Sequence, residues 1–332
     1  MNTTDIQSTF NLARFEPGQR KGHYESYFQR ANHPTKPLAF WIRYTAFIPH
    51  GQPEKAIGEL WAVYFDGLTG SHTAVKREMP ALLSSFDRTR FHVSLDKASL
   101  DARGLKGGIA SGKQKLDWDL KYTSSEGPLF LFPESLYAGS FPKAKVLVGS
   151  PLAEFSGTLR VNGKTIKIQK WPGSQNHNWG SKHTDHYAWG QVSGFDNSKD
   201  TFLELATARL KIGPLWTPAI TPVVLLHKGR EYKLNELVKC FRRANFGYFY
   251  WDFHASSPEI SIKGRITAER KDFVCLRYYN PPGGSKFCLN TKIAACDLEI
   301  QTANGRESLH SKNRAAFEIL TDAEDHGMTP AC

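Results

Sequence analysis

The chain has 332 residues, of which 40% are hydrophobic and 23% charged, so it can bury a sizeable core and is neither disordered nor fibrous. Forty-three Lys and Arg against 32 Asp and Glu give a formal net charge of +11. These charges are scattered and form no long like-charged run, which argues against a nucleic-acid partner, although a basic surface would suit contact with an anionic membrane face. The apolar stretches are far shorter than the roughly 18 residues that a membrane-spanning helix needs.

Residues 1–22 form a polar N-terminal arm without the apolar core of a signal peptide, so we expect the protein in the cytoplasm. The cysteines contain no C-x-x-C pair. An odd, sparse set in a large chain indicates reduced thiols rather than disulfides, zinc ligands or a redox pair. The five are Cys240, Cys275, Cys288, Cys296 and Cys332.

Most aromatic residues lie in short segments whose hydrophobic residues repeat with period two, which predicts β-strands. In residues 39–48, for example, Phe40, Ile42 and Tyr44 fall on one face, and Trp41 and Arg43 on the other. Comparable strands are expected at 57–66, 91–95, 116–122, 129–132, 154–161, 165–170, 187–195, 201–210, 222–227, 246–253, 260–268, 272–279, 287–293 and 296–301. The turn signals between them include Asn162-Gly163 and Asn304-Gly305.

Helices are expected only at 235–242 and within 313–321. So many short strands predict an all-β protein, and because about eight strands close one small barrel, two barrels side by side are expected. We place an N-terminal barrel at 23–172, a C-terminal barrel at 173–325 and a tail at 326–332, with the break at Pro172-Gly173-Ser174. Each half has an early strand with one buried-looking glutamate, Glu59 in the first and Glu204 in the second.

The segment 171–196 has the least ordinary composition, because it combines three histidines with aromatic and amide side chains. Within its strand, Tyr187, Trp189 and Gln191 share one face. A mostly aromatic wall with one polar amide is typical of a ligand cavity.

Two motifs in this segment, His177-Asn178-Trp179-Gly180 and Tyr187-Ala188-Trp189-Gly190-Gln191, resemble the signature of the hydroxyneurosporene synthase (carotenoid 1,2-hydratase) superfamily. That superfamily also takes in AttH-like proteins and, more distantly, tocopherol cyclases and lipocalin-like Diels-Alderases. The stretches 40–45 and 59–63 resemble the opening of the same family, so the resemblance covers about residues 24–299.

The resemblance implies two lipocalin-like β-barrel domains and a hydrophobic, often isoprenoid, ligand. The family's functional His and Trp correspond to His177 and Trp179. The family hydratases also use a Tyr and an Asp on a downstream strand. This chain departs from that pattern, since residues 201–210 offer Glu204 and neither of those types.

Hydration or cyclisation of a prenyl double bond needs an acid that protonates the alkene and aromatic faces that stabilise the cation. A carboxyl group buried in an apolar site has a raised pKa and can be that acid. Glu204 is the first candidate and Asp252 the second, with Tyr250 and His254 on the face of Asp252. Trp179, Tyr187, Trp189 and Trp251 are candidate π faces, whereas a structural ion pair with Arg or Lys is the alternative role for Glu204.

Other motifs point to no metal or cofactor. His177, His183 and His186 lack an H-E-x-x-H or cysteine partner, and the near-P-loop at 107–113 has Gln114 where Ser or Thr must bind magnesium. Three functions remain open: a cofactor-independent hydratase or cyclase acting on an isoprenoid-like or polyketide-like molecule in a barrel cavity, a lipocalin-like carrier of such a molecule, and a structural or interaction protein.

Overall fold

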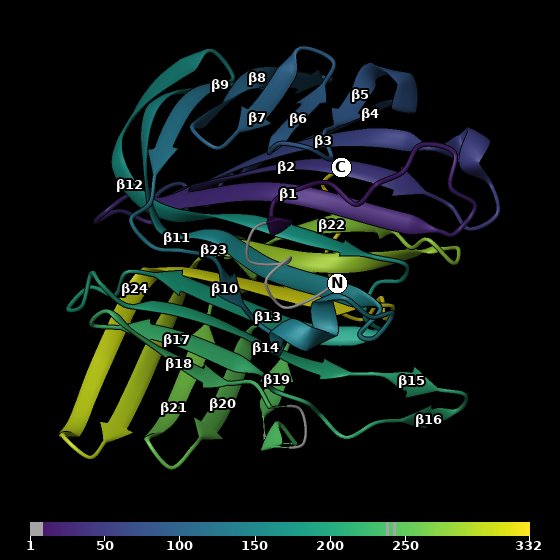
Figure 1. Ribbon diagram of the computed structural model, residues 1–332. Helices are drawn as coiled ribbons and strands as arrows, with labels where there is room; N and C mark the ends of the chain where they lie inside the picture. The colour runs from purple at the N-terminus through teal and green to yellow at the C-terminus, as the bar shows by residue number, and fades with distance from the viewer. Residues whose placement is uncertain (1–8, 237–238, 242–243) are drawn as a thin grey trace.

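The computed structural model describes residues 9–236, 239–241 and 244–332, and its strands form two large antiparallel sheets, one in the upper and one in the lower half of Figure 1. The first sheet has the order β4-β3-β2-β1-β12-β11-β9-β8-β7-β6-β5, with β10 paired to β11. Strand β4 also contacts β8 and β9, which nearly closes the sheet. Its strands are β1 (His23–Asn32), β2 (Leu38–Ile48), β3 (Ile57–Asp66), β4 (Thr73–Pro80), β5 (Ser84–Phe86), β6 (His92–Leu95), β7 (Ala98–Asp101), β8 (Gly104–Ser111), β9 (Gln114–Thr123), β10 (Leu129–Phe130), β11 (Ala144–Val161) and β12 (Lys164–Gly180).

The second sheet has the order β18-β17-β14-β13-β24-β23-β21-β20-β19, with β22 paired to β23. Its strands are β13 (His186–Ser193), β14 (Phe202–Arg209), β17 (Val223–His227), β18 (Arg230–Leu234), β19 (Asn245–Gly247), β20 (Tyr250–Ser256), β21 (Ile260–Thr267), β22 (Val274–Tyr279), β23 (Ser285–Thr302) and β24 (Gly305–Thr321). A small hairpin, β15 (Lys211–Ile212) and β16 (Leu215–Trp216), extends beyond it, and the short 3-10 helices are Pro53–Lys55, Ala81–Leu83, Glu134–Tyr137 and Arg270–Asp272.

The two sheets share one topology. Strands β13, β14, β17 and β18 follow one another in the second sheet as β1 to β4 do in the first, and the long hairpin β23–β24 takes the place of β11–β12. Even the strands off the main path correspond, since β22 pairs with β23 as β10 pairs with β11. The expected all-β, lipocalin-like fold is therefore confirmed, as a duplication visible in strand order.

Strand alternation divides the hydrophobic side chains into layers. In β2, Phe40, Ile42 and Tyr44 join the cluster inside the first sheet. Trp41, on the other face, joins a cluster between the sheets that also contains Trp189 and Tyr278. A further cluster fills the inside of the second sheet. We call the layer between the two sheets the inter-sheet layer.

Two sequence predictions of local structure are wrong. The break expected at 172–174 lies inside β12, which continues to Gly180. Pro172 stands at the point where the pairing of β12 with β1 ends, at Gly173, while the pairing with β11 continues through Glu154. Gly173 is required because a Cβ there would collide with the Arg30 carbonyl.

Residues 313–321, expected to contain helix, lie in β24, between β13 and β23. A central strand buried on both faces reads as a continuous apolar run and is easily mistaken for a buried helix. Of the other expected helix, 235–242, residues 237, 238 and 242 lie outside the described residues. The tail is docked, since Ala331 donates its backbone N–H to the Cys275 carbonyl.

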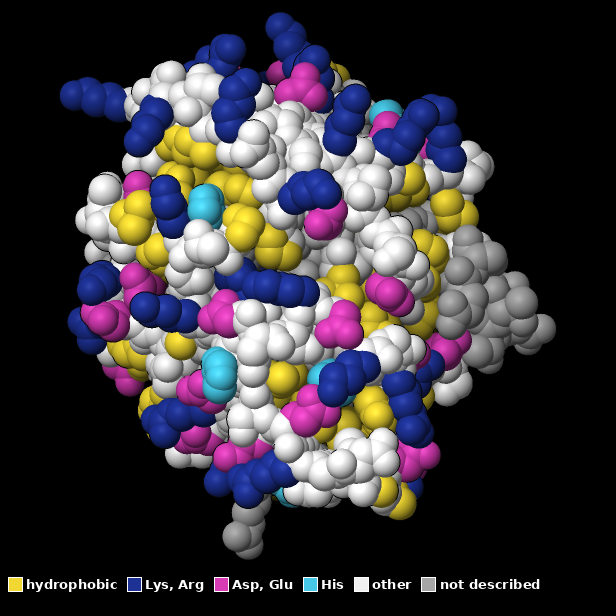
Figure 2. Space-filling view, turned by 90° about the vertical axis from the view of Figure 1, so that its left-hand side faces the viewer, with side chains coloured by type: hydrophobic (Ala, Val, Ile, Leu, Met, Phe, Trp, Pro, Cys, Tyr) yellow, Lys and Arg dark blue, Asp and Glu magenta, His cyan; other side chains and the backbone are white. Residues whose placement is uncertain are grey.

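Lys and Arg side chains are spread over the face seen in Figure 2, with Asp and Glu among them. None of the helices in the described ranges is long and apolar enough to cross a membrane.

Candidate functional site

A cavity of about 140 Å³ lies in the inter-sheet layer, with walls from both halves of the chain. The sequence predicts a ligand cavity inside a barrel, whereas this cavity lies outside both sheet interiors. The interior of each sheet holds a cluster of buried hydrophobic side chains, whereas the cavity lies between the sheets. Its lining is mostly apolar and aromatic. The first half contributes Tyr24, Phe28, Trp41, Leu131 and Phe132, and the second half contributes Tyr187, Trp189, Ala206, Ile220 and Tyr278.

Period-two alternation brings these aromatic side chains together. Phe28 of β1 meets Trp189 of β13 edge to face, with ring centroids 5.9 Å apart, and meets Trp41 of β2 at 6.3 Å. Two predicted binding residues, Tyr187 and Trp189, therefore line the cavity, as the shared face in β13 requires.

Glu204 lies directly behind Trp189 and is fully buried. Its carboxyl accepts hydrogen bonds from Trp189 Nε1 and from Gln191 Nε2, both at 2.8 Å. Burial raises the pKa of Glu204 to about 8, and these two hydrogen bonds, with the charge of Arg30, only partly offset that rise. Ala206, two residues further along the same face of β14, lines the cavity. Two residues of a strand span roughly 7 Å, so Glu204 is attached to β14 at about that distance from a cavity-lining position.

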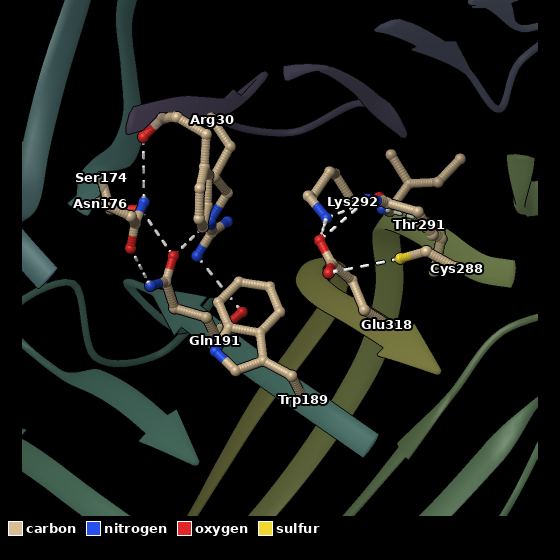
Figure 3. A network of polar contacts seen from close by, with 12 residues as sticks. Arg30, Ser174, Asn176, Trp189, Gln191, Cys288, Thr291, Lys292 and Glu318 are labelled. Carbon is tan, nitrogen blue, oxygen red and sulfur yellow. Dashed lines mark hydrogen bonds and ion pairs between the residues drawn. The ribbon is translucent and has the colours of Figure 1, made fainter. Parts of the chain in front are cut away.

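The nearest cation does not pair with Glu204. Arg30 donates from Nε to Gln191 Oε1 at 2.7 Å, and Ser174 donates to the same oxygen at 2.6 Å. Gln191 in turn donates to Asn176 Oδ1 at 2.8 Å (Figure 3). Gln191, predicted to contact ligand, instead links Arg30 to Glu204 behind the cavity wall.

Glu318 of β24 is a cavity-lining carboxylate that the sequence did not reveal. Lys292 Nζ lies 2.7 Å from Glu318 Oε1, and Asn290 donates to the same oxygen at 2.9 Å (Figure 3). Burial lowers the pKa of Lys292, and the charge of Glu318 partly restores it. Lys292 Nζ also lies 5.4 Å from the Trp189 ring centroid. Trp189 therefore contacts both the Glu204 carboxyl, whose raised pKa favours the neutral form, and the Lys292 ammonium, which is paired with Glu318.

His177 and Trp179 project from the opposite face of β12, away from the cavity. His177 Nε2 lies 2.7 Å from Glu25 Oε1, both side chains are fully buried, and Nδ1 lies 2.7 Å from the Phe10 carbonyl oxygen. Burial alone would raise the pKa of Glu25, but hydrogen bonds from His177 and His23 outweigh it and hold the pKa far below its usual range. Trp179 packs under the Arg14 guanidinium at 4.1 Å. His177 and Trp179 therefore do not line the inter-sheet cavity. The sequence left His177 open between a proton-handling role and a hydrogen-bonded structural plug, and its contacts tie the N-terminal segment to the first sheet.

The predicted site residues of β20 also lie elsewhere. Asp252 is 44% exposed and lies 3.6 Å from Arg265, and Tyr250 and His254 share its solvent-facing side. Trp251 is fully buried inside the second sheet, where its Nε1 donates to Thr207 at 3.1 Å. The predicted alternation in β20 is correct, but neither face of that strand meets the inter-sheet cavity, and Asp252 and His254 line a separate, more open pocket on the outside of the second sheet.

The three histidines considered as metal ligands point to different places: His177 to Glu25, His183 onto the Tyr24 ring at 4.0 Å, and His186 onto Phe246 at 5.0 Å. Burial lowers the pKa of His183 to about 3, which leaves a neutral imidazole in the cavity wall. In the part of the chain that the structure describes, no three His, Cys, Asp or Glu residues gather as a metal site would require.

Comparison with known proteins places this site in context. A family model described as tocopherol cyclase-like matches residues 137–319. Two proteins from strains of Mycobacterium tuberculosis, the uncharacterized proteins MT0513 and Rv0493c, are each 26% identical over 189 residues, which is 56% of this chain and 56% of the relative. The chain thus aligns with about half the length of these curated relatives.

Three solved structures share the fold across nearly the whole chain. An AttH-type protein from Nitrosomonas europaea has a TM-score of 0.56 at 13% identity, covering 93% of this chain and 97% of its own. Kievitone hydratase from Nectria haematococca gives 0.53 at 11% identity, covering 97% and 96%. CghA gives 0.55 at 10% identity, covering 95% and 97%. At these identities the likeness shows the lipocalin-like fold.

Proposed function

Because the chain belongs to the tocopherol cyclase-like family, we propose that it is an enzyme of the hydratase or cyclase type, acting by acid and cation chemistry on an apolar, alkene-bearing molecule held in the inter-sheet cavity. The match includes β13, β14 and most of β24, the strands that carry Trp189, Glu204 and Glu318.

The buried carboxyl of Glu204 carries this proposal. A proton donor to an alkene must be neutral at working pH, near the substrate, and able to be reprotonated. With a pKa of about 8, Glu204 keeps its proton at neutral pH, and it makes no ion pair within the described residues. A carboxyl held only for structure would more often be neutralised by an adjacent cation, as Glu318 is by Lys292.

The aromatic wall suits the second half of the reaction. Protonation of the alkene leaves a tertiary cation, and a desolvated cation gains about 2 kcal/mol from each π face it meets. Trp41, Trp189 and Tyr278 offer such faces in the cavity wall. Water capture of the cation gives hydration, and attack by a nucleophile within the substrate gives cyclisation. Both outcomes occur in the comparisons, hydration in the name of the structural neighbour kievitone hydratase and cyclisation in the description of the tocopherol cyclase-like family.

A carrier without turnover is the second candidate. It is favoured by one feature: Glu204 stands behind Trp189 and is absent from the cavity lining. Proton delivery therefore requires the indole to turn aside or the substrate to enter past it.

The test compares the protein with its Glu204→Gln variant. Each is incubated in ¹⁸O-labelled water with kievitone, with a prenylated hydroquinone and with an apolar extract of the source cells, and products are read by mass spectrometry. Hydration adds the mass of one labelled water, and cyclisation gives an isomer of unchanged mass. We expect Glu204→Gln to lose at least about 100-fold in rate with binding retained. The exposed Asp252→Asn variant is the matched control and should turn over normally.

Equal turnover by Glu204→Gln would remove Glu204 as the acid. If the protein retains a co-purified apolar molecule in native mass spectrometry but converts nothing, the carrier function replaces the enzyme. Trp189→Ala should weaken binding of that molecule at least about tenfold, because it removes one of the two indole rings of the cavity wall.

A further inference from the structure

Arg43 of β2 is a buried cavity-lining cation without a hydrogen-bond acceptor. The residue is 6% exposed, and its guanidinium lies over the Tyr278 ring at 4.4 Å. Nε has no partner, and no carboxylate of the described ranges lies within ion-pair distance of the side chain. Burying a guanidinium whose donors go unused is costly, so an acceptor is expected in the space that it faces.

The other two most deeply buried arginines differ from Arg43. Arg30 donates to Gln191, Asn32 and the Arg314 carbonyl. Arg314 pairs with Asp196 at 2.7 Å and donates to two backbone carbonyls, so that only its Nε has no partner. Their acceptors come from the protein, so both are structural. The acceptor for Arg43 does not come from the described chain.

A second cation, Lys145, lines the same cavity. Its Nζ donates to the Pro142 carbonyl at 2.7 Å and meets no acidic side chain of the described residues. Burial lowers the pKa of Lys145 to about 8, so the amine is still largely charged at neutral pH. The cavity wall thus holds two cations that form no ion pair with the described residues, although the charges of Glu59 and Glu318 act on Arg43 from further away.

A row of unpaired polar atoms runs beside Arg43. Thr45 of β2 pairs in register with Ser26 of β1, which pairs with Asn178 of β12. The Thr45 and Ser26 hydroxyls and the Asn178 carbonyl oxygen are buried and have no hydrogen-bond partner. Ser26 lies between the cavity-lining residues Tyr24 and Phe28 on one strand face, so this row lies next to the cavity, and Asn178 is the member of the row that lines it.

The nearby carboxylates are already engaged. Glu318, the acidic residue of the cavity lining, accepts from Lys292 and Asn290, and Glu59 pairs with Lys76 at 2.6 Å. The guanidinium of Arg43 is therefore the cavity-lining charge whose hydrogen bonds are unmade, while Leu131, Phe132, Ala206 and Ile220 give the same cavity an apolar lining.

We propose that the natural ligand of this cavity carries an acidic oxygen group, a carboxylate or an acidic enol, which binds the Arg43 guanidinium, while its apolar remainder lies along Trp189, Leu131 and Ile220. This inference rests on the proposed function, because it takes the inter-sheet cavity as the substrate site. The acidic group neutralises Arg43, a charge that would otherwise oppose formation of a cation in the same cavity.

The test measures binding of three probes with the same tail, dodecanoic acid, dodecan-1-ol and dodecylamine, by tryptophan fluorescence and calorimetry at neutral pH. A charge-assisted hydrogen bond is worth about 1.5–3 kcal/mol, so we expect the acid to bind about tenfold to 100-fold more tightly than the alcohol, and the amine most weakly. Arg43→Gln should erase the preference for the acid while changing alcohol binding less than about threefold. Arg103→Gln, at an exposed arginine, is the matched control and should change neither.

Equal binding of acid and alcohol by the unmodified protein would overturn the acidic-group proposal and leave the proposed function intact. Failure of all three probes to bind would count against the cavity as a substrate site, and so against both. If Arg43→Gln does not fold, Lys145→Met provides the second test, since it should reduce the preference for the acid several-fold. An unchanged preference in a folded Arg43→Gln variant would also overturn the proposal.

Discussion

Replacing Glu204 by Gln should change how the stability of the fold depends on pH. Burial raises the folded-state pKa to about 8, against an unfolded value of 4.5. A group whose pKa is raised by folding contributes its full stability below pH 4.5 and loses it as pH rises to about 8. Each pH unit in that window is worth about 1.4 kcal/mol, so the unmodified protein loses about 5 kcal/mol across it. Glutamine does not titrate and escapes this loss.

The assay is urea unfolding, followed by tryptophan fluorescence, of both proteins at several pH values from 4 to 9. The free energy of unfolding of Glu204→Gln minus that of the unmodified protein should be flat below about pH 4.5 and then rise by about 5 kcal/mol. Glu324→Gln, at an exposed position, is the control and should follow the unmodified protein throughout. A difference that stays constant with pH would mean that folding does not raise the pKa of Glu204, so that its carboxyl is ionised at neutral pH, and the proposed proton donor would lose its physical basis.

Two further predictions concern residues outside the cavity. His177→Leu should lower the free energy of unfolding by about 3 kcal/mol, because it leaves the buried Glu25 carboxylate without its closest side-chain donor. Thermal unfolding measures this loss. The ligand affinity per folded molecule should not change. Asp252→Asn should shift stability by less than about 0.5 kcal/mol and leave turnover unchanged, since its partner Arg265 is also exposed, and a larger effect in either assay would return Asp252 to the site.

Strands whose two faces differ in side-chain type could be predicted from the sequence. Strands β2 and β3 occupy almost the predicted ranges, because the two faces of each strand pack into different clusters and period two is therefore preserved. The Asn162-Gly163 turn was also predictable, since both residues adopt the positive φ that this dipeptide favours.

Strands buried on both faces could not be predicted from the sequence. Strand β1 was missed and β24 was partly assigned to helix, and both lie at the centre of a sheet with the inter-sheet layer on one side. Residues on their two faces meet an aromatic core and a polar network, so the sequence alternates between two kinds of buried environment. Hydrophobicity alone carries no period there.

The candidate site was predictable where one strand face defines it, as for Tyr187, Trp189 and the neighbouring Glu204. Arg43, Lys145 and Glu318 come from three other strands, and only tertiary pairing brings them to the cavity. One local signal existed for Arg43: a cation set between Trp41 and Thr45 in a strand whose other residues are almost all apolar. His177 and Asp252 show the opposite error, since titratable residue types in an informative segment point to chemistry only when their strand face is known.

The duplicated topology explains why function would concentrate between the sheets rather than within either one. Each sheet's interior is occupied by its own hydrophobic cluster, which must remain close-packed for that half to fold. The inter-sheet layer is formed by the opposite strand faces and is free of that requirement, so it accommodates Arg43, Glu204 and Glu318 at positions that would be costly in either core. Neither half alone builds the cavity, because β1 and β2 supply one wall and β13, β14 and β24 the other. Substitutions in this layer can therefore alter the ligand while both cores stay intact, which is the physical condition under which one fold can serve hydration, cyclisation or carriage.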